Sequence, residues 1–175
     1  MPIAVAHRHI AALCLVVGLL AGSYVLFHPL GRASTSATRS DCGNVGAATV
    51  VTQTNTYRDS LGLSRLRVVP KLHAFALVHA REMAASHRLT HFSTAGLSFA
   101  QRARASTYRF SMLRENIAVD ASSSHGSLAS SLMRLWKRSP GHDANMRARD
   151  VSQIGVGLAA GTHGCYASMD LGSPR

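Results

Sequence analysis

A run of uncharged, mostly apolar residues from Ile10 to Phe27 most constrains what this chain can fold into. A helix of these 18 residues spans about 27 Å, close to the roughly 30 Å hydrocarbon core of a bilayer. A stretch of this length and polarity is typical of a segment that enters a membrane. We therefore expect residues 1–30 to form one N-terminal membrane helix.

This helix is either removed after export or retained in the membrane. The small residues Ala21-Gly22-Ser23 have the spacing of a signal-peptide cleavage site, whereas the apolar continuation from Tyr24 to Phe27 favours a retained transmembrane anchor. Arg8 and the terminal amine favour an N-terminus on the cytoplasmic side. The rest of the chain would then be extracytoplasmic, either membrane-anchored or secreted.

Residues 31–41 separate this segment from the rest of the chain. They consist of small and polar residues, two arginines and one aspartate, without a large apolar group, which is typical of a linker. The remaining residues, 42–175, have the length of one domain. We expect the folded domain to begin at Cys42.

Two cysteines lie at opposite ends of this domain, Cys42 and Cys165. Outside the cytoplasm the environment is oxidising, and a pair of cysteines in such a domain commonly forms a disulfide. We predict that they are bridged. Two free thiols are the alternative.

Apolar periodicity predicts helices first and strands later, which indicates an α+β fold. The predicted helices are Ala47–Leu61, Pro70–His87, a short helix capped by Ser98, and Ser127–Lys137. The predicted strands are an antiparallel hairpin of Val151–Ala159 and Cys165–Leu171, with a short third strand at Glu115–Val119.

The chain is strongly basic, with 19 Lys and Arg against 8 Asp and Glu. We expect Arg102 and Arg104 to point outward from the short helix, where with Arg109 and Arg114 they could form a patch for an anionic polymer. Few aromatic residues lie among these arginines to stack on bases. We expect no nucleic-acid partner.

The domain contains only two glutamates, so their positions are informative. Glu82 is predicted to be a solvated charge in the middle of a helix. Glu115 leads into the apolar sequence Asn116-Ile117-Ala118, which predicts a carboxylate drawn towards the interior.

His91 and His142 each follow a predicted helix, in loops. Two imidazoles and a carboxylate suit either a divalent ion or an acid/base pair, whereas each histidine alone is more often structural.

Several segments together resemble a known family. They are Leu72–Ala84, Thr90-His91-Phe92, Arg114-Glu115-Asn116-Ile117-Ala118, Trp136–Met146 with its Ser-Pro-Gly-His-Asp-Ala-Asn sequence, and Ile154-Gly155-Val156-Gly157. In order and spacing they are similar to the SCP domain of the CAP superfamily (cysteine-rich secretory proteins, antigen 5 and pathogenesis-related proteins), above all to its bacterial secreted branch.

The resemblance implies a three-layer α-β-α sandwich around a small antiparallel sheet. It also implies a cleft in which His91, Glu115 and His142 bind a ligand. In many eukaryotic members a second glutamate stands three residues after the tryptophan, but this chain has Ser139 there. We therefore expect no required cofactor, and at most weak binding of a divalent metal such as zinc by His91, Glu115 and His142.

These observations lead to two hypotheses about function. In the first, the chain is an exported, non-enzymatic CAP-domain module that binds an unidentified extracellular ligand, which could be lipid, glycan or protein. In the second, it is a divalent-metal-dependent hydrolase that uses the same cleft. Motifs of the common hydrolases are absent from the sequence, including HExxH and G-x-S-x-G. The catalytic residues, if there are any, cannot be named from the sequence.

Overall fold

The computed structural model describes residues 42–121 and 127–175. They form five helices and four strands in the order α2 (Asn44–Ser60), β1 (Arg67–Val68), α3 (Pro70–Ser86), α4 (Phe99–Ala105), β2 (Phe110–Asp120), α5 (Leu128–Arg138), α6 (Pro140–Arg147), β3 (Gln153–Gly161) and β4 (Gly164–Pro174). The expected membrane helix and linker lie outside the described residues. Within those residues, no helix is long and apolar enough to span a bilayer.

The four strands form one sheet in the order β1-β3-β4-β2. The hairpin of β3 and β4 is antiparallel as predicted, and β2 pairs antiparallel with the other edge of β4. The expectation of a purely antiparallel sheet is wrong, because β1 pairs parallel with β3. β1 has only two residues, both exposed, so it carries no periodicity from which it could be predicted.

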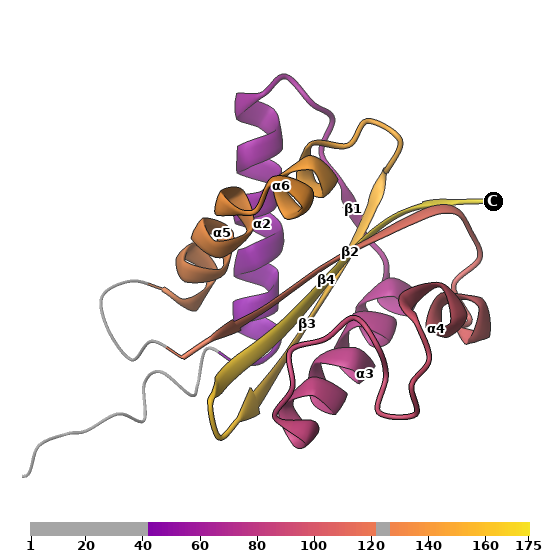
Figure 1. The fold of residues 1–175 in the computed structure, drawn as a ribbon. Helices are drawn as coiled ribbons and strands as arrows, with labels where there is room; N and C mark the ends of the chain where they lie inside the picture. The colour runs from indigo at the N-terminus through magenta and orange to yellow at the C-terminus, as the bar shows by residue number, and fades with distance from the viewer. Residues whose placement is uncertain (1–41, 122–126) are drawn as a thin grey trace, which may run out of the picture. The chain divides into compact units, whose positions relative to one another are not determined.

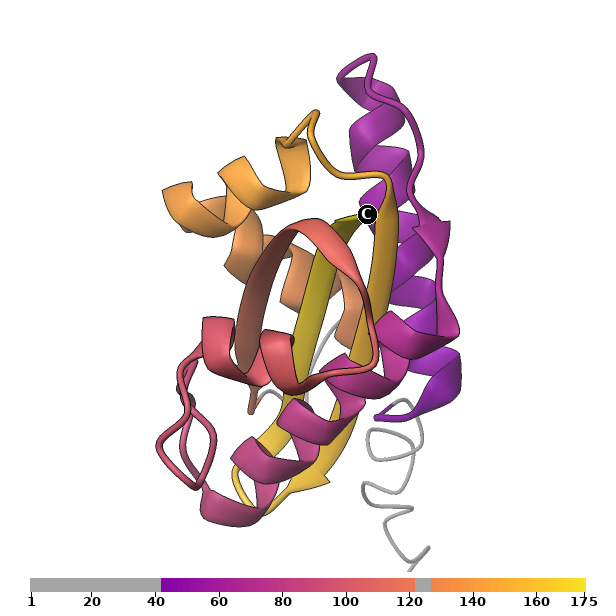
Figure 2. The same cartoon turned by 90° about the vertical axis from the view of Figure 1, so that its right-hand side faces the viewer.

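Helices cover both faces of the sheet, as expected for three layers (Figures 1 and 2). α2, α5 and α6 lie on one face, and α3 and α4 on the other. The main apolar core fills the first interface and includes the fully buried Leu132, Trp136 and Ile154. Trp136 also donates from Nε1 to the carbonyl of Ile117, at 3.1 Å, so it fastens α5 to β2.

α3 approaches β3 backbone to backbone. A Cβ atom on Gly155 would lie 2.2 Å from the carbonyl carbon of Leu72, and one on Gly157 would lie 2.2 Å from the amide nitrogen of Leu77. No side chain fits between the two elements at these points. The glycines interleaved in the predicted strand are therefore explained by this contact.

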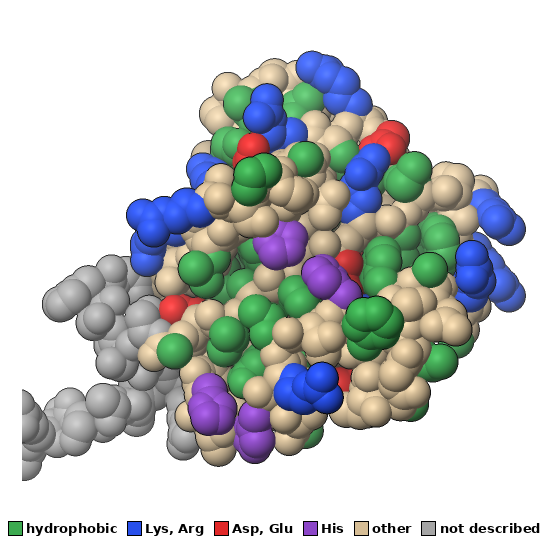
Figure 3. All heavy atoms as spheres, viewed as in Figure 1, with side chains coloured by type: hydrophobic (Ala, Val, Ile, Leu, Met, Phe, Trp, Pro, Cys, Tyr) green, Lys and Arg blue, Asp and Glu red, His purple; other side chains and the backbone are tan. Residues whose placement is uncertain are grey.

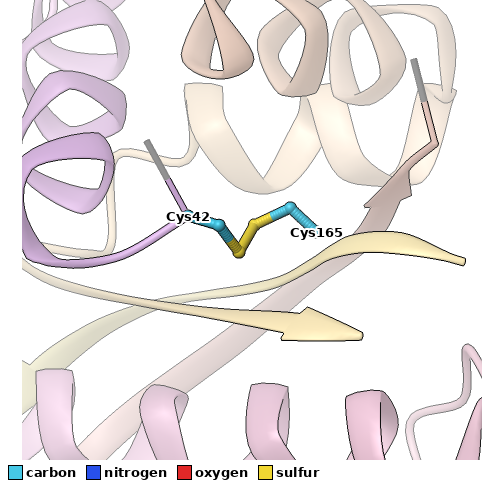
Figure 4. Close-up of a disulfide and its surroundings, with 2 residues drawn as sticks. All are labelled: Cys42 and Cys165. Carbon is cyan, nitrogen blue, oxygen red and sulfur yellow. A yellow bond between two sulfur atoms is a disulfide. The ribbon is translucent and has the colours of Figure 1, made fainter. Parts of the chain in front are cut away.

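The disulfide between Cys42 and Cys165 is present, as predicted (Figure 4). Cys42 precedes α2, and Cys165 is the second residue of β4. The bridge therefore fastens the start of the first described helix to the centre of the sheet.

One helix was not expected. The segment after α5 was predicted to be a loop that contains His142, but Pro140–Arg147 forms α6. Proline is favoured in the first turn of a helix, where its missing N–H leaves no bond unmade. Pro140 thus ends α5 and begins α6, and Ser139 caps both.

Candidate functional site

His91 and His142 come from elements far apart in the sequence. His91 lies in the loop between α3 and α4, and His142 in the first turn of α6. Their ring centroids are 6.2 Å apart. Histidine side chains lie at the middle of the face shown in Figure 3, next to an acidic side chain and among apolar ones. The structure therefore brings together the two histidines that the sequence singled out.

Glu115 lies in β2 and points into the protein, as predicted, with a side chain that is 1 % exposed. Its Oε2 atom is 3.3 Å from Nδ1 of His91. A carboxylate can only accept, so Nδ1 of a neutral His91 carries the proton and Nε2 keeps its lone pair. The acid thereby sets the tautomer of a half-exposed imidazole.

Arg102 is the main partner of Glu115, and the prediction that Arg102 points outward is wrong. Its side chain is only 7 % exposed. Its Nη2 atom donates to both carboxylate oxygens of Glu115, at 2.6 Å for Oε2, and to the carbonyl of His91 at 3.1 Å. Spacing could have indicated this: Arg102 stands three residues after Phe99 and next to the buried Ala103, on the inward face of α4.

Two aromatic rings enclose the guanidinium of Arg102. Its Cζ atom lies 5.4 Å from the ring centroid of Phe75 on α3 and 5.5 Å from that of Phe99 on α4. Both distances are within the range of cation–π attraction. The Ser98 capping box, with Gln101 as its partner, fixes the start of α4 as predicted. The position of the arginine is thus determined by packing as well as by charge.

His79, a buried residue of α3, lies beside Glu115 at the edge of the site. Its Nε2 atom lies 2.8 Å from the carbonyl of Thr90, to which it donates, and 3.8 Å from Oε1 of Glu115. Its Nδ1 atom is 3.4 Å from Glu82, whose side chain is 31 % exposed. Glu82 is therefore not the freely solvated charge that was predicted. His79 is buried and structural, and it holds the loop that carries His91.

Two asparagines connect the site's elements. Asn116 donates from Nδ2 to the carbonyl of His142 at 2.9 Å. Asn145 donates from Nδ2 to the carbonyl of Glu115 at 3.2 Å and to Oδ1 of Asn116 at 2.9 Å. β2 and α6 are therefore locked together beside the histidines. The bond from Asn145 also occupies one backbone carbonyl of β2, that of Glu115, in a strand at the edge of the sheet.

Asp170 was missed by the sequence analysis. It stands opposite Glu115 in the register of β2 and β4 and is fully buried. Burial raises the pKa of the Asp170 carboxyl well above its ordinary value, and the charge of Glu115 raises this pKa further. Ser168 donates to its Oδ2 at 3.4 Å, while Oδ1 has no hydrogen-bond partner among the described residues. The only sequence signal was the scarcity of acids, since a strand residue's partner across the sheet is not visible in the sequence.

The pKa of His142 is lowered, first because burial disfavours the charged imidazolium and second because His91 stands beside it. Glu115 opposes this shift, but the net direction is downward. His142 is therefore neutral at pH 7. The site presents uncharged imidazole above a carboxylate that an arginine already neutralises.

The arrangement does not fit the metal site that the family resemblance implies. Both oxygens of Glu115 accept from the guanidinium of Arg102, and the Glu115 side chain is 1 % exposed, so a metal ion at this carboxylate would be buried beside a second cation. In the part of the chain that is described, no group of three or more His, Cys, Asp or Glu side chains is placed to hold an ion. Weak zinc binding remains a prediction, and the residues best placed for it are His91 and His142.

The proposed basic patch is not formed as expected. Arg102 is buried, and Arg114 donates to the carboxylate of Asp150, at 2.6 Å for the shortest contact. This contact also lowers the pKa of Asp150. Arg104 and Arg109 are left exposed, so four arginines do not act together on one surface.

A pocket of about 500 Å³ lies next to the site, between the C-terminal end of α3 and the loop that follows it. Its lining combines polar and apolar side chains: Glu82, Met83, Ser86, Arg88, Thr90 and Phe92, with Ser93, Thr94 and Gly96. Thr90 and Phe92 flank His91 in the sequence, so the pocket and the histidine share one loop.

Comparison with known proteins identifies the fold. The family model described as "CAP: Cysteine-rich secretory protein family" matches residues 51–171. An extracellular SCP-domain protein from Bacillus anthracis str. Ames is similar, with a TM-score of 0.67 and 19 % identity over 81 % of this chain and 44 % of that one. This chain therefore spans less than half of that relative's length. A search of curated proteins found no match.

Two further structures have the same fold. An outer surface protein from Borrelia burgdorferi has a TM-score of 0.65 and 20 % identity, over 79 % of this chain and 96 % of that one. NaASP2, whose crystal structure was determined with Zn²⁺, has a TM-score of 0.56 and 14 % identity, over 77 % of this chain and 83 % of that one.

Proposed function

The chain belongs to the cysteine-rich secretory protein (CAP) family, and on that premise we propose that it is a non-enzymatic module that binds a ligand outside the cytoplasm. The ligand contacts His91 and His142. This proposal concerns the chain's own residues, because members of one fold often differ in what they do.

The state of Glu115 carries this proposal. Its side chain is 1 % exposed and is paired with Arg102, so it is shielded from direct contact with a substrate. The two groups left to meet a ligand are the imidazoles of His91 and His142. Nε2 of His91 is an acceptor, and such groups suit hydroxyl or amide groups of a lipid, glycan or protein.

Three observations support an extracytoplasmic location. The domain contains a disulfide, which persists in oxidising compartments. The Bacillus and Borrelia proteins are described as an extracellular protein and an outer surface protein. The uncharged segment Ile10–Phe27 would direct export of the domain across the membrane, either as a cleaved signal peptide or as a membrane anchor.

Binding can be tested with two defined probes, vesicles of phosphatidylethanolamine and phosphatidylglycerol and purified peptidoglycan sacculi, using the exported chain. We expect His91→Ala/His142→Ala to reduce retention on one probe at least tenfold. The control is His87→Asn/His163→Ala, a second pair of neighbouring histidines whose ring centroids are 5.3 Å apart. Asn is chosen because residue 87 has φ 55°. Equal retention of all three chains on both probes would count against a histidine-lined binding site for lipid or glycan.

The hydrolase alternative makes a different prediction. A zinc-dependent enzyme would turn over chromogenic esters or fluorogenic peptides, and would lose this activity in His91→Ala/His142→Ala. We expect no turnover above that of the double variant, with or without added zinc. Zinc-stimulated turnover that disappears in the variant would replace the binding proposal with the enzymatic one.

A further inference from the structure

We propose that Arg102 is the resident cation of this site and that it prevents Glu115 from ligating a divalent metal. The inference concerns the chain's own arginine and does not depend on which ligand the module binds. It explains the poor fit of the metal site by the position of one residue, Arg102.

The first step in the argument is the contact itself. One guanidinium nitrogen, Nη2, bonds both oxygens of Glu115 and also the backbone carbonyl of His91. The arginine therefore holds the carboxylate and the loop of the first histidine at the same time. A metal ion at Glu115 would have to bind a carboxylate whose two oxygens already accept from this cation.

The second step is that packing restricts the movement of the Arg102 side chain away from Glu115. Its guanidinium lies against the rings of Phe75 and Phe99, and its side chain is buried. Within the described residues its Nε atom has no hydrogen-bond partner, so the side chain is held by the Glu115 contact and by packing. If zinc bound Glu115 with Arg102 in place, two cationic groups would share one buried carboxylate. Such repulsion is strong in a low-dielectric interior.

The third step concerns what remains for a metal. With Glu115 engaged and Asp170 fully buried, His91 and His142 remain to offer a ligand atom. Tight zinc sites use three or four protein ligands. Wild-type protein should therefore bind zinc weakly, through imidazoles alone. Neutralising residue 102 should release the carboxylate and add a third ligand.

The experiment compares Arg102→Gln with Arg104→Gln, a matched change on the exposed side of the same helix. Zinc affinity is measured by competition with a chromophoric chelator at pH 7.5, and folding is checked by near-ultraviolet circular dichroism. We expect Arg102→Gln to bind zinc about tenfold or more tightly than wild type, the size of change typical when the groups around metal ligands are altered. Arg104→Gln should match wild type. Equal affinity in a folded Arg102→Gln chain would overturn the proposal.

A measurement on the wild-type chain decides the matter if Arg102→Gln does not fold. Zinc is titrated while the side-chain carboxyl ¹³C signal of Glu115 and the imidazole signals of His91 and His142 are followed by NMR. We expect the Glu115 signal to stay in place, whether or not the imidazole signals of His91 and His142 move. A Glu115 signal that shifts together with both imidazoles would show a three-residue metal site and would overturn the proposal. Neither result bears on retention by vesicles or sacculi, so the two proposals fail separately.

Discussion

At the scale of single residues, the pair Arg102 and Glu115 dominates the interior of the site. Removing one member of a buried ion pair leaves the other charged without a partner, which costs about 3 to 5 kcal/mol. We expect Arg102→Met and Glu115→Gln each to lower the free energy of unfolding by an amount in this range, as measured by urea denaturation at pH 7.5. Arg104→Met, on the exposed side of α4, should change it by less than about 0.5 kcal/mol.

The pKa of His142 leads to a pH dependence at the same scale. Because its pKa in the folded chain is lowered, the unfolded chain takes up a proton first as the pH falls. The stability linked to neutral His142 is therefore fully present above about pH 6.5, the ordinary histidine value, and is lost as the pH falls through the lowered pKa. Urea unfolding at pH 7.5 and pH 5.5 should show a smaller loss in His142→Gln than in wild type. An identical loss in the two chains would show that His142 does not contribute.

At the scale of secondary-structure elements, the contact between α3 and β3 leaves no space for a methyl group. A Cβ at residue 157 would meet the backbone of Leu77, which cannot move aside as a side chain can. We expect Gly157→Ala to lower the free energy of unfolding by about 1 to 3 kcal/mol, the usual cost of overpacking. Gly43→Ala is the matched control, because no atom lies within 4 Å of the position its Cβ would take.

The contact matters for function because α3 carries two neighbours of the site. Phe75 packs on Arg102, and His79 holds the carbonyl of Thr90 beside His91. A shift of α3 away from β3 would therefore loosen the arginine and the histidine loop together. Thermal melting of Gly157→Ala followed by near-ultraviolet circular dichroism would report both effects.

At the scale of the whole molecule, one covalent bond closes most of the domain. The disulfide joins residues 123 positions apart. In the chain-entropy account, a bridge over a loop of this length stabilises the fold by up to about 4 to 5 kcal/mol, by restricting the unfolded chain. We expect reductant to lower the urea midpoint of the wild-type chain. Cys42→Ser/Cys165→Ser should have the lower midpoint from the start and no response to reductant.

Much of this fold could be predicted from the sequence because periodicity and capping are local. α3 begins at Pro70 and α4 is capped by Ser98 as expected, and the hairpin of β3 and β4 lies where alternation and turn residues placed it. The apolar residues after Glu115 likewise indicated that this acid points inward, and the family motifs placed it near His91. β1 and α6 were missed, because two exposed residues have no pattern and a proline that ends one helix can start the next.

The sequence by itself indicated which two histidines and which glutamate would lie close together, because their motifs are local and in order. Only the tertiary structure decided which charged groups meet in that site. Arg102 was assigned to the surface because an arginine is normally solvated, and its burial depends on Glu115 from a strand and Phe75 from another helix. Asp170 lies across the sheet from Glu115 for the same kind of reason. Partners of buried charges come from distant parts of the chain, so the spacing within α4 can show that Arg102 faces inward but not which acid it meets.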